Sequence, residues 1–250
     1  LKDLEQSDHL KWPCILKTAQ FGYDGKGQQI VSDPDEARKA FISLGGTPCI
    51  LEEKVSLQCE ISVVLGRNQA GEVCYFPVAE NHHQDGILHI STVPAGVSPE
   101  LQTYACEIAH RIAEALDYIG IITVEYFVDQ NNQLLVNEIA PRVHNSGHYT
   151  MDACNISQFE QQVRMICGWT PADTANHTAV AMVNILGDAW KDGVLPAAKL
   201  FDDVNVKLHL YGKRGAKPGR KMGHFNVLGE NVKDARQHAE QVYEKLMGLE

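Results

Sequence analysis

The sequence lacks long apolar runs and paired cysteine motifs. No apolar run in its 250 residues approaches the roughly 18 residues of a membrane-spanning helix, and no signal stretch opens the chain. Its seven cysteines are scattered and never spaced C-x-x-C, which argues against both a disulfide framework and a zinc site. We therefore expect a cytoplasmic protein with no membrane partner.

Positive charge is also scarce, and most of the chain has no basic patch. There are 22 lysines and arginines against 32 acidic residues, for a formal charge of -10, which disfavours nonspecific nucleic-acid binding. The exception is the stretch 213–221, KRGAKPGRK. A basic loop in an acidic chain indicates a local anionic ligand. The alternatives are a solvated turn or a nucleic-acid patch, and the latter has little of the aromatic interleaving that it needs.

The remaining composition, 44% hydrophobic and 22% charged, is that of a globular protein. Apolar periodicity and capping signals predict an α+β fold with antiparallel sheets. The predicted strands include 73–81 and a buried strand at 179–186. The predicted helices cover residues 34–44, 98–117, 157–167 and 232–247.

The glycine-rich stretch 17–31, KTAQFGYDGKGQQIV, is not a Walker A loop. Only two residues separate Gly22 from Gly25, and Gly27 follows Lys26 where that motif needs serine or threonine. Strand-like segments flank it, which predicts a hairpin with a mobile tip. The tip either holds phosphate or is an ordinary turn.

A second hairpin brings two glutamates to opposite positions. A two-residue type I′ turn at 131–132 would place Glu125 directly opposite Glu138 on one face of the sheet. The flanking pairs would be Thr123 with Ala140 and Phe127 with Val136. Opposed carboxylates cost about 0.2–1 kcal/mol, and a magnesium ion turns that cost into a binding site. The alternative is a turn of three or five residues, which moves one side chain to the other face.

Polar residues follow that hairpin and fill one further segment. Arg142, His144 and Asn145 come just after the second strand, where Arg142 either grips a phosphate or carboxylate or forms a surface salt bridge. The segment HHQDGILH, 82–89, suggests a second metal site, but polar contacts to a nucleotide or within the loop are the preferred interpretation.

Several of these segments, in this order along almost the whole chain, resemble the 5-(carboxyamino)imidazole ribonucleotide synthetases, ATP-grasp enzymes of purine biosynthesis. The segments are LKTAQFGYDGKGQ, EEKVSLQCEISVV, AENHHQDGIL, VEYFVD, VNEIAPRVHNSGHYT and YGKRGAKPGRKMGHFNV. The resemblance implies an ATP-grasp fold in which two antiparallel sheets clamp ATP. It also implies carboxylation of 5-aminoimidazole ribonucleotide with ATP and bicarbonate through carboxyphosphate.

The resemblance assigns roles to single residues. Magnesium ligands are Glu125 and Glu138. Residues implied to bind the nucleotide are Lys17, Gly22, Gly25, Lys26, Gly27, Gln28, Glu52, Glu53, Lys54, Val55, Glu60, His83, Asn137 and Glu138. Catalytic residues are Tyr23, Asp24, Lys26, Arg142 and His144. Substrate-binding residues are Arg142, His144, Asn145, Lys213 and Arg220, of which the last two would grip the 5′-phosphate.

The resemblance also predicts the domain organisation. It implies an ATP-grasp domain at 1–186 with a mobile lid near 13–66, and a small C-terminal lobe at 187–250 for the substrate phosphate. The family's N-terminal domain is not in the sequence, so we expect these residues alone to lack a complete site, and the full-length protein to be a homodimer. Another ATP-grasp ligase or formyltransferase, and a noncatalytic nucleotide-binding module, are the alternatives.

Overall fold

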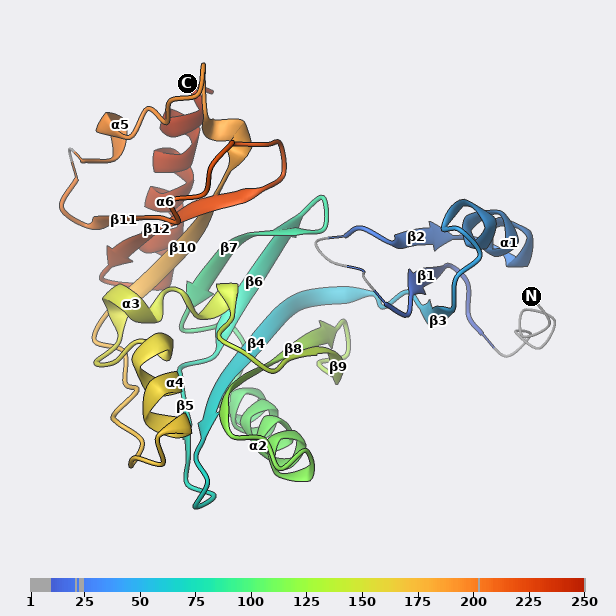
Figure 1. Cartoon of the computed structure of the whole chain (residues 1–250), viewed down its shortest axis with the longest axis horizontal. Coiled ribbons are helices and arrows are strands. Elements are labelled where there is room, and N and C mark those ends of the chain that lie inside the picture. The colour runs from blue at the N-terminus through green and yellow to red at the C-terminus, as the bar shows by residue number, and fades with distance from the viewer. Residues whose placement is uncertain (1–9, 21, 23–24, 202, 250) are drawn as a thin grey trace. The chain divides into compact units, whose positions relative to one another are not determined.

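The computed structural model describes residues 10–249 except residues 21, 23, 24 and 202 (Figure 1). The chain divides into two compact units. The small unit comprises residues 1–56 and 84–87, and the large unit comprises residues 57–83 and 88–250. Both combine helices with antiparallel sheets, which confirms the predicted α+β class.

In its described residues, the small unit is a three-stranded sheet covered by one helix. The strands are β1 (Cys14–Thr18), β2 (Gln28–Val31) and β3 (Cys49–Glu53), in the order β2-β1-β3. The helix α1 (Pro34–Ser43) begins where predicted, because the Asp33 side chain accepts a hydrogen bond from the backbone N–H of Glu36. Its small core is formed by the buried residues Cys14, Leu16, Val31, Ala37 and Ala40.

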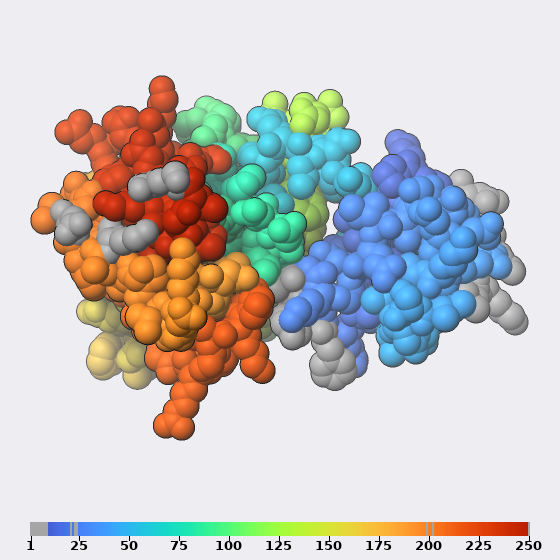
Figure 2. Space-filling model, turned by 90° about the horizontal axis from the view of Figure 1, so that it is seen from above, coloured from blue at the N-terminus to red at the C-terminus, as the bar shows by residue number. Residues whose placement is uncertain are grey.

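The large unit is built on one nine-stranded sheet. Its main path runs β11-β12-β10-β7-β6-β4-β8-β9, with β5 paired to β4. The strands are β4 (Leu57–Arg67), β5 (Val73–Tyr75), β6 (Ala79–Gln84), β7 (Ile87–Val93), β8 (Gly120–Asp129), β9 (Leu134–Ala140), β10 (Ala179–Leu186), β11 (Val206–Leu210) and β12 (Lys221–Gly229). The last three extend the same sheet. Figure 2 shows the C-terminal part of the chain, in orange and red, on the surface of the large unit.

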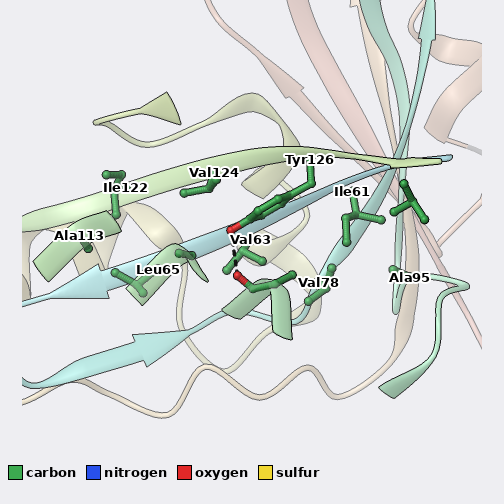
Figure 3. Packing of buried hydrophobic residues seen from close by; sticks show 12 residues of the cluster. Ile61, Val63, Leu65, Val78, Ala95, Ala113, Ile122, Val124 and Tyr126 are labelled. Atoms are coloured by element: carbon green, nitrogen blue, oxygen red, sulfur yellow. Dashed lines mark hydrogen bonds between the residues drawn. The ribbon is translucent and has the colours of Figure 1, made fainter. Parts of the chain in front are cut away.

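Strand alternation puts one apolar core on the α2 side of β4 and β8. Alternate residues of these strands, such as Ile61, Val63 and Tyr126, are fully buried against α2 (Pro99–Ala115), as Figure 3 shows. The Tyr126 hydroxyl donates to the Ala105 carbonyl at 2.8 Å, so the ring's polar end is satisfied inside this core. The residues between them point to the other face, here called the site face.

Further helices complete the large unit. These are η2 (Asn145–Gly147), α3 (Thr150–Ala153), α4 (Gln158–Ile166), η3 (Gly187–Ala189), α5 (Ala198–Phe201) and α6 (Val232–Met247). Helix α6 packs on β10 and β12, and α4 packs on β4 and β8. The long predicted helices and the strand at 179–186 are therefore confirmed to within about two residues.

Two local predictions were wrong. The predicted strand 73–81 is divided into β5 and β6 by the segment 76–78, because Pro77 has no N–H to donate to a strand ladder. The turn of the β8–β9 hairpin has three residues rather than two: Asp129 and Gln133 close it, with a 3.0 Å bond from the Asp129 N–H to the Gln133 carbonyl. Asn132 takes the left-handed conformation, with a φ of 60°.

Candidate active site

The centre of the site face is a row of polar residues across three strands. Ser62 of β4 lies opposite Glu125 of β8, and Glu125 lies opposite Glu138 of β9. The carboxyl group of Glu138 also interacts with that of Glu125. The predicted opposition of the two glutamates is confirmed.

That opposition is reached by a different route from the predicted one. The three-residue turn sets Phe127 opposite Leu135 rather than Val136, and this register would have paired Glu125 with Asn137. A register shift between Glu125 and Tyr126 leaves Asn137 as the extra residue of β9. This bulge restores Glu138 to the position facing Glu125, and the neighbouring pair of Thr123 with Ala140 is found as predicted.

Glu125 is a buried carboxylate held in its charged form. Only 7% of the residue is exposed, and its Oε1 lies 2.9 Å from His144 Nε2. Burial by itself would raise the pKa of Glu125. The hydrogen bond from His144, together with the electrostatic effects of His144 and His83, lowers this pKa below its usual range. An ionised glutamate beside a second, exposed one is a donor set that suits a hard divalent cation.

His144 is fixed by its backbone and by its ring. The buried Gln158 side chain accepts from the His144 N–H at 2.9 Å and donates to the His144 carbonyl at 2.7 Å. The ring Nδ1 lies 2.9 Å from Ser146 Oγ and accepts from the Ser146 backbone N–H at 3.3 Å. The ring therefore has one orientation, with Nε2 toward Glu125.

Glu60 and His83, two residues implied to bind nucleotide, form a pair of their own. His83 Nδ1 lies 2.7 Å from Glu60 Oε2, and both side chains are partly exposed. Burial would lower the pKa of His83, but the hydrogen bond and charge of Glu60 raise it above its ordinary value. Glu60 precedes Ser62 on β4, so this pair also lies on the site face.

The implied substrate residues of the β9 end have distinct environments. Arg142 is exposed and donates to the Val143 carbonyl at 3.0 Å. Asn145 exchanges two hydrogen bonds with Asn184 of β10, at 2.9 and 2.7 Å. Asn145 is thus held to the central strands, while the Arg142 guanidinium reaches solvent.

The basic loop joins β11 to β12, and its cations are anchored to the loop backbone. Lys213 Nζ donates to the Lys221 carbonyl at 2.7 Å, and Arg220 donates to the carbonyls of Arg214 and Gly215 at 2.8 and 3.1 Å. Lys213 and Arg220 are both exposed. The charges are therefore presented to solvent on an ordered loop.

The small unit carries the other implied nucleotide residues. Lys17 Nζ lies 2.5 Å from Glu52 Oε2, so a phosphate at Lys17 would compete with a carboxylate. Gln28 is opposite Lys17 in the β1–β2 pair. Glu53 accepts from the Lys11 N–H, Lys54 donates its N–H to the Pro13 carbonyl, and Val55 is half-buried.

The glycine loop lies between β1 and β2. The Thr18 N–H donates to the Gly27 carbonyl at 2.8 Å. Gly27 has a φ of 78°, and a Cβ there would meet Thr18 Oγ1 at 2.6 Å, so glycine is required. Gly22 and Lys26 are exposed, and Gly25 lies against the turn at Gly86. Tyr23 and Asp24 lie outside the described residues.

Within the described part of the chain no cluster of three or more histidine, cysteine or acidic residues has metal-binding geometry, so the glutamate pair is the candidate cation site.

Five residues that sequence reasoning missed complete the site. The missed residues are the buried Ser62, Asn81, Ser91, Ser146 and Gln158. The available signal was a polar residue inside an apolar strand, as in EISVV at 60–64.

No helix in the described part of the chain is long and apolar enough to cross a lipid bilayer.

Two family models match the chain. The ATP-grasp domain covers residues 2–159, and the phosphoribosylaminoimidazole carboxylase C-terminal domain covers residues 180–238.

Named relatives are N5-carboxyaminoimidazole ribonucleotide synthases. The chain is 45% identical to that of Brucella melitensis over 86% of its own length, and 43% identical to that of Bacillus subtilis over 90%. It spans only 59% of the length of each of these relatives.

Solved structures agree with the relatives. An ADP complex of an N5-carboxyaminoimidazole ribonucleotide synthetase has a TM-score of 0.88 at 41% identity, covering 96% of this chain and 63% of that one. The Aspergillus clavatus enzyme with ADP and 5-aminoimidazole ribonucleotide has a TM-score of 0.89 at 30% identity, covering 98% and 65%. The similarity predicted from the sequence motifs is confirmed.

Proposed function

The chain belongs to the ATP-grasp family, and we propose that it carries the catalytic part of an enzyme that carboxylates 5-aminoimidazole ribonucleotide with ATP and bicarbonate. The observation that carries this proposal is the pair Glu125 and Glu138, opposed on the site face beside His144. The match of residues 180–238 to the carboxylase C-terminal domain supports this choice among ATP-grasp ligases.

Magnesium fits the glutamate pair, because one member is an ionised, buried carboxylate and the other is an exposed one. Glu125 and Glu138 would hold it. When bound, the ion neutralises the negative charge of the nucleotide phosphates. His144 keeps Glu125 charged and oriented, as a magnesium ligand must be. This role of His144 is separate from any contact that His144 makes with the substrate.

The other residues bind and orient the reactants. In the small unit, Lys17, Lys26 and the glycine-loop amides would bind the ATP phosphates. Tyr23 and Asp24, which lie outside the described residues, are the candidates for contact with the substrate. In the large unit, Glu60 and His83 would hold the ribose of ATP, while Arg142, His144 and Asn145 would contact the aminoimidazole ribonucleotide. Lys213 and Arg220 would bind its 5′-phosphate, since guanidinium and ammonium groups donate strong hydrogen bonds to phosphate oxygens.

The proposed reaction has two steps that balance. A bicarbonate oxygen attacks the γ-phosphorus of ATP, so that ADP leaves and carboxyphosphate forms. The carboxyl carbon then passes to the exocyclic amine of the substrate, with phosphate as the leaving group and loss of an amine proton. A reactive anhydride must be kept from water, and a closing glycine loop is the proposed means.

The test has a binding arm and a turnover arm. Calorimetry of ADP with MgCl2 on the 250-residue chain should show magnesium-dependent binding. Glu138→Gln should raise the magnesium concentration that half-saturates this binding about tenfold or more. Glu240→Gln, which removes an exposed carboxylate of α6 paired with Arg236, is the matched control and should bind normally.

Turnover is measured on protein made from the complete gene. ADP formation should rise when 5-aminoimidazole ribonucleotide and bicarbonate are present together. Binding of magnesium and ADP without any such stimulation would instead identify a noncatalytic nucleotide-binding module, and stimulation by formate would identify a different ligase. Absence of both binding and turnover would overturn the proposal.

A further inference from the structure

A continuous chain of buried hydrogen bonds leads through the large unit to Glu125. Ser91 Oγ lies 2.7 Å from Asn81 Oδ1, Asn81 Nδ2 lies 3.0 Å from Ser62 Oγ, and Ser62 Oγ lies 2.8 Å from Ser146 Oγ. Ser146 Oγ then meets His144 Nδ1, whose ring contacts Glu125. All six residues are less than 9% exposed.

Each hydroxyl has one hydrogen to donate, so the bonds set one another's direction. Ser91 donates to the amide oxygen of Asn81, and the amide NH2 of Asn81 donates to Ser62. The single Ser62 hydrogen therefore goes to Ser146. The hydrogen of Ser146 is then directed to His144 Nδ1.

A backbone group also favours this direction. The Ser146 backbone N–H also points at His144 Nδ1, at 3.3 Å, and a backbone amide can only donate. A ring nitrogen that receives two donors carries no hydrogen of its own. The ring hydrogen therefore sits on Nε2, directed to the Glu125 carboxylate.

Packing alone does not require these polar groups. Neighbours on the same face, such as Val64 and Met182, form an apolar cluster, and an apolar residue at position 62 would join that cluster without any hydrogen bond to satisfy. Ser62 lies opposite Glu125 in the strand register, yet its hydrogen goes to Ser146. The polar chain is therefore built around the imidazole.

We propose that Ser62, Asn81 and Ser91 are positioning residues that hold His144 in the tautomer with hydrogen on Nε2, and thereby hold Glu125 as a metal-binding carboxylate. None of them needs to touch nucleotide or substrate. The part of the proposal that concerns His144 rests on the hydrogen bonds alone, whereas the part that concerns metal rests on the proposed function.

The first arm of the test reads the tautomer directly. In 15N-labelled protein, two-dimensional spectra of the histidine side chains show which ring nitrogen carries hydrogen, and His144→Gln identifies the His144 signals. The wild type should carry hydrogen on Nε2 only. Ser62→Ala removes the donor that commits the Ser146 hydrogen to Nδ1, so only the 3.3 Å contact of the Ser146 N–H still opposes hydrogen on Nδ1, and signals of the Nδ1–H tautomer should appear.

The second arm measures the magnesium concentration that half-saturates binding of ADP. Ser62→Ala should raise it about tenfold or more, as loss of a partner that orients a metal ligand commonly does, while ADP binding without magnesium stays unchanged. The matched control is Thr92→Val, because Thr92 is buried next to Ser91 but points to the opposite face. It should change neither readout.

The outcomes separate the two levels of the proposal. If Ser62→Ala changes neither the tautomer nor the magnesium dependence, the inference is overturned. If only the tautomer changes, the metal part fails. If the wild type does not bind ADP with magnesium, the proposed function fails. The tautomer measurement then still decides whether the hydrogen-bond chain positions His144. Should Ser62→Ala not fold, Ser91→Ala, at the far end of the same chain, is measured with the same expected results.

Discussion

At the scale of single residues, Gln158 has the most demanding position in the site. Its side chain pairs with both backbone polar groups of His144 and also lies 2.9 Å from His148 Nδ1. Gln158 is fully buried, and no water can replace those bonds without entering the core. One glutamine of α4 therefore fixes the backbone of the loop that presents His144.

Removing that side chain should be costly. Gln158→Ala leaves a buried N–H and a buried carbonyl without partners, so the free energy of unfolding should fall by about 2 kcal/mol or more. Urea denaturation measures the loss. Gln130→Ala, which removes an exposed glutamine bonded to the Leu57 carbonyl, should cost less than about 0.5 kcal/mol. Equal losses in the two variants would contradict the role given to Gln158.

A second residue-scale feature is a cluster of stacked histidines beside α3. His224 stacks on His209 at 4.6 Å and contacts the Tyr211 hydroxyl through Nδ1, and His148 lies 4.9 Å away. Burial lowers the pKa of His224 to about 2 and that of His148 to about 4. His209 in turn pairs with Asp152.

These shifts predict acid sensitivity. Below the unfolded-state pKa of about 6.5, the unfolded chain binds protons at His224 and His148 that the folded chain does not. The free energy of unfolding should therefore have its full value above that pH. On acidification toward pH 4 it should fall by up to about 1.4 kcal/mol per pH unit for each histidine.

Urea titrations at several pH values test this prediction. His224→Gln should flatten the dependence between pH 6.5 and 4, and the exposed His177→Gln should leave it unchanged. An unaltered slope in His224→Gln would show that the acid sensitivity arises elsewhere.

At the scale of elements, the basic loop depends on a glycine outside it. A Cβ at Gly187 of η3 would lie 2.1 Å from the Lys217 carbonyl oxygen and 2.6 Å from the Lys217 nitrogen. The Gly187 N–H also donates to the Arg220 carbonyl at 2.8 Å. The loop backbone is thus packed directly on η3, which explains how a segment with five cations is held in one conformation.

Gly187→Ala should displace that loop. The expected loss of unfolding free energy is about 1–3 kcal/mol, as for other overpacked positions, and trypsin should cut within 213–221 faster than in the wild type. Gly193→Ala adds a Cβ with no atom within 4 Å at a φ of 78°, so it should show backbone strain alone and normal cleavage of the loop. Unchanged cleavage in Gly187→Ala would contradict this packing argument.

At the scale of the whole molecule, the two units differ in the size of their cores. Among the described residues, the small unit has one cluster of five buried residues, whereas the large unit has three clusters of twelve each. Stability is distributed according to buried apolar contact. The glycine loop thus belongs to the less stable unit, which agrees with a proposed role as a closing element.

Hydrogen exchange should separate the units. Amides of β1 and β3 should exchange faster than those of β4, β8 and β10, as measured by mass spectrometry of peptic fragments. Leu16→Ala, in the small core, should speed exchange of β1–β3 and leave β8 unaffected. One uniform exchange rate for all strands would contradict independent opening of the small unit.

Local signals were enough to locate most elements. Asp33, Ser98 and Ser157 begin helices where capping rules place them, and each accepts a hydrogen bond from a backbone N–H of the first turn. Family motifs likewise identified the ATP-grasp family, because such motifs are contiguous stretches of sequence. These features depend on neighbours within a few residues, so a sequence contains them in full.

Contacts between distant strands were decided only by the tertiary structure. The opposition of Glu125 and Glu138 was predicted from a two-residue turn, but it arises from a three-residue turn followed by a bulge at Asn137. A one-residue change in the turn is compensated by one extra residue in the strand, and nothing local to the turn signals this. The hydrogen-bond chain through Ser62 and the clamp of Gln158 join residues up to 84 positions apart, and only packing of the strands and α4 brings their polar atoms within reach.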